Sequence, residues 1–164
     1  MPTFTIPLVI RDLTASDLPA CRWSGSATHL AAVAAAVDRA ARGEVAFLAA
    51  SGPAGLPLAM LGVDFTKRRG AGLLWMLAVH AVVQSCGVGS VLIAAAEERI
   101  LGRGLARAEI SVEDINPRAR ALYERLGYVA YGVEDEAWDE ETPDGTVRRY
   151  HARCVTMAKQ LARS

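Results

Sequence analysis

One turn of the chain has the composition of a phosphate-binding loop, and it consists of Gln84, Ser85, Cys86, Gly87, Val88, Gly89 and Ser90. It follows a predicted strand and opens a predicted helix. Glycine has no side chain, so the backbone can approach a ligand closely. The first amides of a helix lack partners within the helix and carry a partial positive charge, which favours an anion. We therefore predict a diphosphate site here, against the alternative of a tight turn that binds nothing.

Two other kinds of nucleotide loop do not fit this turn. A P-loop requires Gly-Lys-Ser/Thr at the start of the helix, whereas Gly89 is followed by Ser90 and Val91. A dinucleotide fingerprint requires a third small residue where Leu92 stands. A thiolate near the amides of a helix start can be reactive, but we interpret Cys86 as a tolerated loop residue.

A second motif lies farther along the chain and begins at Asn116. This residue is predicted to cap a helix whose first position is Pro117, and both residue types are favoured at those positions. The predicted buried face of that helix consists of Ala119, Leu122 and Leu126. Tyr123 lies at the edge of this face, where it is either a half-buried aromatic residue or a phenol available for proton transfer.

Taken together, the two motifs resemble the GNAT superfamily of acyl-CoA N-acyltransferases. The resemblance rests on Gln-x-x-Gly-x-Gly after a strand, followed later by Asn-x-x-Ala-x-x-Leu-Tyr-x-x-x-Gly-Tyr, and it is close from Leu77 to Tyr128. These motifs are specific for the superfamily and not for any one member. One departure is Ala81, because relatives often carry proline at that position, and its absence should loosen the entry to the loop slightly.

The resemblance implies a role for each matching residue. Leu77 and Val79 would end the strand that binds the pantetheine arm, near a bulge that splays it from the next parallel strand. The turn 84–90 would hold the diphosphate mainly through its amides. Asn116 would contact the cofactor arm from the other side, and Tyr123 would protonate the departing thiolate as the general acid. The amide of Val79 or His80 would stabilise the oxyanion.

The general base is not fixed by the motifs. Ribosomal-protein N-terminal acetyltransferases, which the chain also resembles, tend to carry glutamate where Ser111 stands, and serine alone cannot act as this base. Glu109 shares a strand face with Ser111, because side chains alternate along a strand. We therefore predict Glu109 as the first acid to consider, with a solvent-facing role as the alternative. A packed His80 and a water chain are the other options.

An acidic segment follows the second motif. Its acids are Glu134, Asp135, Glu136, Asp139, Glu140, Glu141 and Asp144, with Trp138 among them and no lysine or arginine. The segment is expected to form a loop between two late strands, where the resemblance implies acceptor binding. As a hypothesis, the acids attract a cationic amine and Trp138 packs on it. A solvated loop anchored by Trp138 is the alternative.

Hydrophobic patterns, turns and caps predict an α/β fold. The expected helices span residues 26–42, 87–101 and 116–126, and the expected strands span residues 8–12, 44–51, 57–64, 72–79, 106–112, 128–133 and 147–158. A GNAT-like single domain over residues 1–164 would have a mixed, mostly antiparallel sheet of about seven strands. A parallel splayed pair would lie at its centre, with helices flanking the sheet.

Composition agrees with one folded domain. The chain has 164 residues, 52% hydrophobic and 22% charged, with 18 basic and 18 acidic residues. This balance gives no electrostatic reason to expect nucleic acid or a membrane as a partner. The cysteines and histidines are too scattered for a zinc site or a disulfide framework. No secretion signal is visible, so we expect a cytoplasmic protein. We expect no metal, and the resemblance suggests a homodimer.

These observations predict an acetyl-CoA-dependent N-acetyltransferase. It would transfer the acetyl group directly to a primary amine of a small molecule that the sequence does not identify. A protein N-terminal acetyltransferase of the ribosomal-protein type is one alternative. A non-catalytic module that binds acyl-CoA without turnover is the alternative from a different class.

Overall fold

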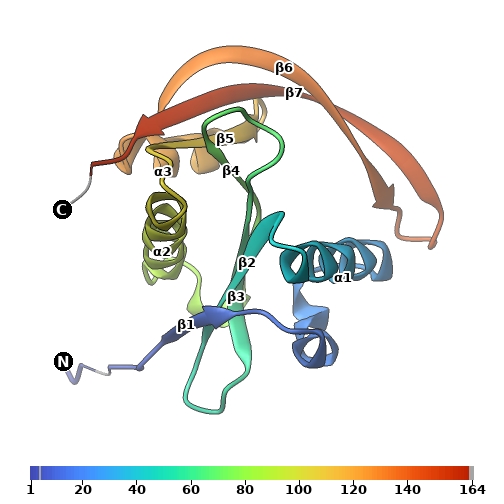
Figure 1. Ribbon diagram of the computed structural model, residues 1–164. Coiled ribbons are helices and arrows are strands. Elements are labelled where there is room, and N and C mark those ends of the chain that lie inside the picture. Colours follow the sequence, from blue (N-terminus) through green and yellow to red (C-terminus); the bar gives the residue numbers. More distant parts are fainter. Residues whose placement is uncertain (4, 163–164) are drawn as a thin grey trace.

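The computed structural model describes residues 1–3 and 5–162, and these form one sheet with helices on both faces (Figure 1). The strands are β1 (Val9–Asp12), β2 (Val45–Ser51), β3 (Pro57–Asp64), β4 (Gly72–Val79), β5 (Arg107–Glu113), β6 (Val129–Glu141) and β7 (Val147–Gln160). The α-helices are α1 (Ala27–Ala41), α2 (Val88–Gly102) and α3 (Pro117–Arg125), and two 3₁₀ segments are η1 (Ala15–Ser24) and η2 (Ala81–Val83).

The sheet has seven strands in the order β1-β2-β3-β4-β5-β7-β6. Every neighbouring pair is antiparallel except β4 and β5, which are parallel. A parallel pair requires a crossover connection, and α2 provides it. The predicted α/β class and its mixed sheet with one central parallel pair are therefore confirmed.

The parallel pair separates after a short stretch because β4 contains a bulge. Pairing between β4 and β5 covers only Gly72–Leu74 and 108–110. Met60 and Gly62 of β3 are two residues apart, whereas their partners in β4, Ala78 and Trp75, are three residues apart. β4 therefore has one extra residue in this stretch. Met76, which lies within it, has a φ of 59°, a left-handed conformation that is uncommon outside glycine. The bulge that the resemblance implied is present, and it leaves one edge of β4 unpaired.

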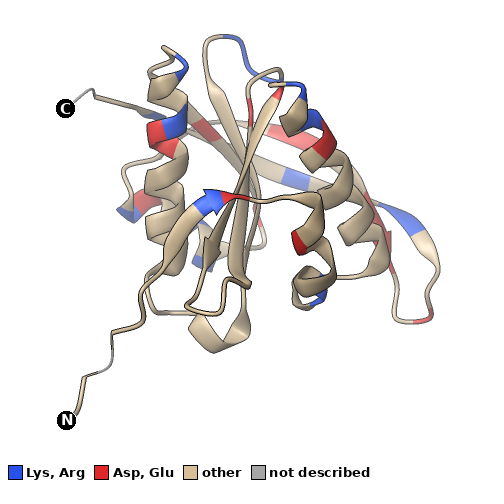
Figure 2. Cartoon of the chain, turned by 60° about the horizontal axis from the view of Figure 1, so that its bottom comes forward, with Lys and Arg blue, Asp and Glu red and all other residues tan. Residues whose placement is uncertain are grey.

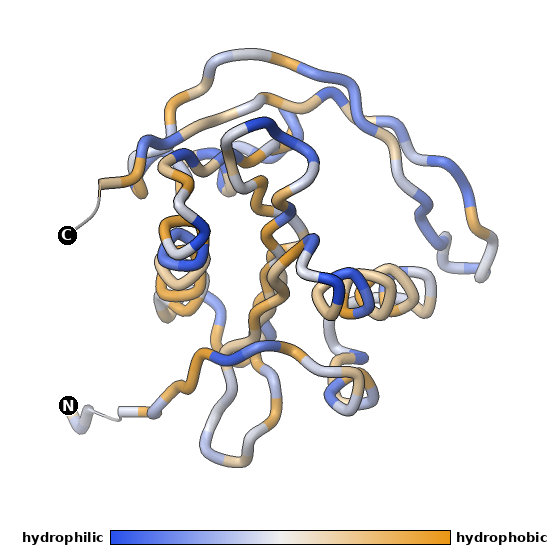
Figure 3. The backbone as a smooth tube through the Cα atoms, viewed as in Figure 1, coloured by the Kyte–Doolittle hydropathy of each residue, from blue (hydrophilic) through white to orange (hydrophobic). Residues whose placement is uncertain are grey.

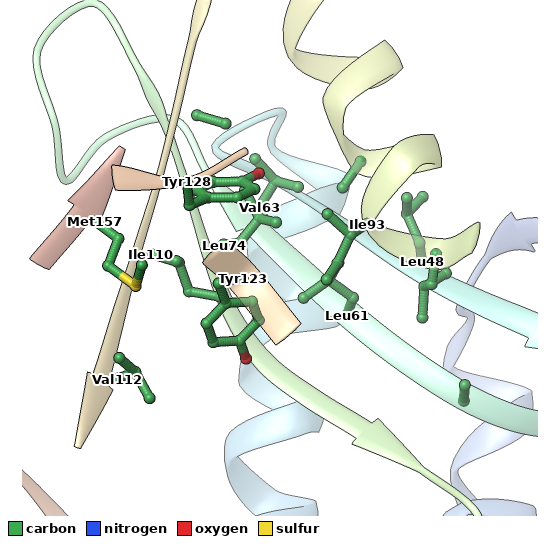
Figure 4. Packing of buried hydrophobic residues seen from close by; sticks show 14 of the residues in the cluster. Leu48, Leu61, Val63, Leu74, Ile93, Ile110, Val112, Tyr123, Tyr128 and Met157 are labelled. Atoms are coloured by element: carbon green, nitrogen blue, oxygen red, sulfur yellow. The ribbon is translucent and has the colours of Figure 1, made fainter. Parts of the chain in front are cut away.

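Two apolar layers cover the sheet, one on each face. Adjacent residues of β2 serve different layers, because Phe47 packs with the α1 side and Leu48 with the α2 side. Figure 3 shows the apolar colour concentrated in the central strands and in α2. Figure 4 shows the layer on the α2 and α3 side, where Leu61, Leu74 and Ile93 meet. β4 contributes residues to both layers, whereas β5 contributes to the layer on the α2 side.

Two parts of the chain differ from the sequence-based expectation. Residues 15–24 form η1, which was not predicted, and its start is fixed by Asp17, whose carboxylate accepts from the amide of Thr14 (2.8 Å) and pairs with Arg11 (2.7 Å). The acidic segment, predicted as a loop, is mostly strand, because β6 extends to Glu141.

The extension of β6 follows from its pairing with β7. Trp138 lies opposite Tyr150, with ring centroids 5.0 Å apart. The next two acids toward the turn, Asp139 and Glu140, lie opposite arginines of β7 and form ion pairs with them. Directly opposed aromatic residues and opposite charges stabilise antiparallel strands. Figure 2 shows acidic and basic segments along this hairpin. An acidic run that looks unpaired in sequence is thus partly neutralised across the ladder.

Two further findings concern the described residues. No helix among them combines the length and the apolar character that crossing a membrane requires. Within the same ranges, no three His, Cys, Asp or Glu side chains gather closely enough to hold a metal ion.

Replacing Gly62 with alanine should lower the free energy of unfolding by about 1–3 kcal/mol. A Cβ at this position would lie 2.5 Å from a ring carbon of Trp75, across the strand pair that contains the bulge. The control is Gly102→Ala, where a Cβ meets nothing within 4 Å, and where alanine should be neutral or stabilising by up to about 1 kcal/mol. Urea denaturation measures both variants, and equal stabilities would contradict this packing.

Candidate active site

A cleft of about 1440 Å³ opens where β4 and β5 separate. Its walls come from β4, β5, α1, α3 and β6, and its polar lining combines acids of β6 with basic residues such as Arg39, Lys67 and Arg68. β6 also packs against α1, where the hydroxyl of Thr28 donates to Glu141 (3.4 Å). The cleft is therefore bounded on one side by the two diverging strands and on the other by α1 and the long hairpin.

The open edge of β4 forms the first wall. Leu77 lines the cleft. The amide of His80 donates to the carbonyl of Leu58 (2.7 Å), so it is occupied and cannot serve as the oxyanion donor. Because hydrogen-bonding residues alternate along an antiparallel pair, this bond turns the amide and carbonyl of Val79 toward the open edge. The carbonyl of Val79 accepts from Nε2 of Gln84 (3.0 Å), which leaves the Val79 amide as the remaining backbone donor.

The glycine-bearing turn connects this edge to α2. Ser85 and Gly87 have φ values of 62° and 81°, so the turn uses the left-handed region twice. In the part of the chain that the structure describes, no side chain caps α2, and its first backbone bond runs from Val91 to the carbonyl of Gly87 (3.1 Å). The amides of residues 88–90 are thus without helical partners. A Cβ at Gly89 would contact Val79 at 3.8 Å, which places this helix start beside the end of β4.

Several predicted residues of the turn have a shaping role in the structure. The side chain of Gln84 ties the turn to β4, as described above. Cys86 is an exposed free thiol whose Sγ lies 3.5 Å from the carbonyl of Gln84. Val88 is buried under the helix start. Sequence reasoning missed Arg118, whose Nη2 donates to the hydroxyl of Ser85 (3.1 Å) and brings a cation to the turn from α3.

Asn116 and Tyr123 approach the cleft from α3. Asn116 caps the helix as predicted, accepting from the amide of Ala119 (3.1 Å), and its Nδ2 donates to no other residue of the described chain. Tyr123 is 7% exposed, yet it lines the cleft. Its ring packs on Tyr128 with centroids 6.3 Å apart, and its hydroxyl points away from that ring (Figure 4). Burial raises the pKa of Tyr123, so the phenol holds its proton at neutral pH.

Glu109 lies apart from these residues. It does not line the cleft, and its carboxylate pairs with Arg107 (2.8 Å) and Arg68 (3.3 Å) while the hydroxyl of Tyr131 donates to it. Burial alone would raise the pKa of Glu109, but the bonds from Arg107 and Tyr131 and the arginine charges outweigh it and lower the pKa. The carboxylate is therefore held ionised within a network, and its catalytic role stays a prediction.

Ser111 lines the cleft instead and holds a different acid. Its hydroxyl donates to Oε1 of Glu134 (2.8 Å), and Arg68 pairs with the same oxygen. Glu136, two residues further along β6, also lines the cleft. His80, the other candidate base, caps η2 by accepting from the amide of Val82 (3.2 Å) and packs 5.2 Å from the ring of Trp23. The acids nearest the separation of the strands thus come from β6.

Comparisons with known proteins agree with this geometry. The model of the acetyltransferase (GNAT) family matches residues 34–128. Among solved structures, an IAA acetyltransferase from Bacillus cereus ATCC 14579 is 18% identical, with a TM-score of 0.70, over 94% of this chain and 100% of that one. The ribosomal-protein-S18-alanine N-acetyltransferase from Escherichia coli is 20% identical, with a TM-score of 0.70, over 96% of each chain.

A further solved structure holds a ligand. It is the paia N-acetyltransferase from Thermoplasma acidophilum in complex with coenzyme A, 15% identical, with a TM-score of 0.68, over 94% of this chain and 99% of that one. At these identities the solved structures establish the fold. No curated protein was found to match the chain by sequence.

Replacing Glu109 with glutamine should lower the free energy of unfolding by about 1–3 kcal/mol at neutral pH. The pKa of this carboxyl is lower in the folded than in the unfolded chain. Its stabilisation is therefore fully present above the unfolded value of about 4.3 and is lost as the pH falls through the folded value. Denaturation curves of wild type and variant should thus converge in acid.

The control for this experiment is Glu98→Gln, because Glu98 is exposed on α2. It should change stability little at either pH. A Glu109→Gln variant as stable as wild type at neutral pH would contradict the network. A rate loss that exceeds the loss of folded protein would instead support the predicted catalytic role of Glu109.

Proposed function

We propose that this chain, which belongs to the acetyltransferase (GNAT) family, transfers an acetyl group from acetyl-CoA to a primary amine of a small molecule. Residues 1–164 would act as one catalytic unit. One observation carries the proposal: the unpaired edge of β4 and the phenol of Tyr123 border the same separation of strands, and the partnerless amides of the α2 turn lie beside the end of β4. An extended thioester ligand with a diphosphate at one end fits such an arrangement.

The turn and the strand edge would bind different parts of the cofactor. The amides of residues 88–90 would receive the diphosphate, since the helix dipole adds to their charge. Arg118 would add a cation beside it. The pantetheine arm carries amide groups, which can pair with the free backbone of β4 as a missing strand would. This fixes the thioester at the separation of β4 and β5, and positioning alone can lower a barrier by about 7–11 kcal/mol.

The chemistry would then need two protein groups at the thioester. The Val79 amide faces the open edge and would stabilise the oxyanion that forms when the amine attacks the carbonyl carbon. When the C–S bond breaks, Tyr123 would donate its proton to the thiolate. A phenol that burial keeps protonated is suited to this step. The protein supplies no covalent intermediate in this scheme, so the transfer is direct.

Release of free coenzyme A thiol from acetyl-CoA tests the proposal. The acceptor panel comprises spermidine, kanamycin, an Nα-blocked lysine amide and a lysine-free tetrapeptide with an alanine amino terminus. Turnover with one of the first three supports the proposal. Turnover with the tetrapeptide alone would favour a protein N-terminal acetyltransferase, the activity named for the Escherichia coli neighbour. Cofactor binding without turnover for any amine would favour the alternative that the chain is a non-catalytic acyl-CoA-binding module.

Replacing Tyr123 with phenylalanine should lower kcat by about 10²–10⁴-fold, with little change in the affinity for coenzyme A. The control is Tyr128→Phe, because the Tyr128 hydroxyl donates to Glu97 (3.0 Å) and does not line the cleft. That control should lose stability without losing rate per folded molecule. Steady-state kinetics corrected for active protein measure both, and a Tyr123→Phe enzyme with wild-type kcat would exclude the phenol as the acid.

Replacing Arg118 with alanine should weaken coenzyme A binding by about two- to tenfold at low salt, and by less at high salt, because the side chain is exposed. The control is Arg120→Ala on the same helix, since Arg120 pairs with Glu124 (2.9 Å). Calorimetric titration at two salt concentrations compares the three proteins. Equal dissociation constants for Arg118→Ala and wild type would remove Arg118 from the cofactor site.

A further inference from the structure

The proposed function leaves the proton acceptor for the amine unassigned. We propose that Glu136 is this general base, with Glu134, Ser111 and Arg68 as the groups that position it. The inference rests on the proposed function and names a residue of the same cleft. It places the base on β6, whereas the resemblance pointed to β5.

The position of these acids relative to the separating strands is the first argument. Pairing between β4 and β5 ends at Ile110, so Ser111 is the first residue of β5 beyond it. Ser111 donates to Glu134 (2.8 Å), and Arg68 pairs with the same carboxylate. Glu136 stands on the same face of β6 as Glu134, because they are two residues apart, and it lines the same cleft. Glu134 is thus fixed at the vertex of the cleft, and Glu136 stands next to it on the same face of β6.

The second argument is the face of the sheet on which the acids lie. Ser111 donates to Glu134 on the face of β5 opposite to the apolar layer of α2 and α3, and Glu136 shares the strand face of Glu134. Its neighbours Ile110 and Val112 turn the other way, into the layer that holds Tyr123. A base on one side and an acid on the other match direct transfer, in which the amine arrives on one side and the thiolate leaves on the other.

The electrostatic surroundings differ for the two acids. Burial and the neighbouring Glu134 raise the pKa of Glu136. Burial also acts on Glu134, but the bond from Ser111 and the charge of Arg68 outweigh it and lower the pKa. A base works best when its pKa lies near the working pH, and of these two Glu136 is the one shifted in that direction. Glu134 instead stays ionised beside it.

Groups from other elements also face this pair. Arg68 comes from the β3–β4 loop, Glu113 from β5 and Cys154 from β7, and α1 adds His29 and Arg39 to the cleft. Burial and the surrounding acids raise the pKa of Cys154 to about 11, so it remains a thiol. Three of these groups are engaged: Arg39 pairs with Asp64 (2.9 Å), Nε2 of His29 forms a hydrogen bond with the hydroxyl of Ser24 (3.1 Å), and the Tyr150 hydroxyl donates to Glu113 (2.8 Å).

The proton balance is complete with this assignment. The amine enters as an ammonium ion and gives one proton to the Glu136 carboxylate, which later releases it to solvent at the open cleft. The neutral nitrogen attacks the thioester carbonyl carbon, and the C–S bond breaks. The nitrogen loses its second proton to solvent as the amide forms, while Tyr123 protonates the thiolate and regains a proton from water. One proton ends on coenzyme A and one in solution.

The test compares kcat/KM across pH for wild type and Glu136→Gln, using the amine of the panel above that wild type acetylates fastest. The variant should be slower by about 10²–10⁴-fold at neutral pH. Wild type should reach a plateau above the pKa of Glu136. Without the base, the rate should follow the fraction of unprotonated amine, rising about tenfold per pH unit toward the amine's own pKa, about 7.7–8.0 for an α-amine and about 10.4 for a lysine-type amine.

Controls separate this role from a structural one. Glu136→Asp keeps a carboxylate and should keep the plateau at a reduced rate, whereas Glu98→Gln should behave as wild type. Coenzyme A should bind Glu136→Gln as tightly as wild type. A Glu136→Gln enzyme with unchanged kcat/KM, or a slower one that keeps the wild-type pH profile, overturns the assignment alone. If wild type releases no thiol with any amine of the panel, the proposed function falls and the assignment with it.

Discussion

The loss of pairing between β4 and β5 is the constraint on which the rest of the site depends. A parallel pair in a closed sheet has no free backbone, and no extended ligand could enter it. Here one extra residue at Met76 shifts the register against β3, and the parallel pair ends at Leu74 and Ile110. Because β4 packs into both apolar layers and β5 packs into one layer and pairs with β7, the strands separate without the sheet coming apart. The separation leaves the edge of β4 unpaired and opens the cleft at the point where the pairing ends.

The two sides of the cleft differ in the chemistry they offer. On the side of α2 and α3, backbone amides, Arg118 and the buried phenol of Tyr123 suit an anionic, extended cofactor with a thiol leaving group. On the side of α1 and the hairpin, the carboxylates of Glu134 and Glu136 suit a cationic amine. The basic residues on that side are largely paired with acids, as Arg39 and Arg68 show. The two sides thus differ in which charged groups they offer a ligand, although the chain as a whole has a formal net charge of zero.

The sequence predicts the parts of this design that depend on local rules. The helix over residues 26–42, the cap at Asn116, the glycine-bearing turn and the strand alternation all follow from backbone chemistry, and the structure confirms these elements. What it does not reveal depends on register. The acids of β6 look like a loop until the arginines of β7 are placed opposite them. Glu109 looks available until the bulge near Tyr131 brings that hydroxyl onto it. Arg118 becomes informative only once α3 lies beside the turn.

A crystal structure with bound coenzyme A tests the central claim most directly. The account predicts the pantetheine arm along the free edge of β4 from Trp75 to Val79, the diphosphate on the amides of residues 88–90, and the sulfur beside the hydroxyl of Tyr123. A ligand bound outside the separated strands would contradict it, as would a β4 edge that closes onto β5 and leaves the turn empty.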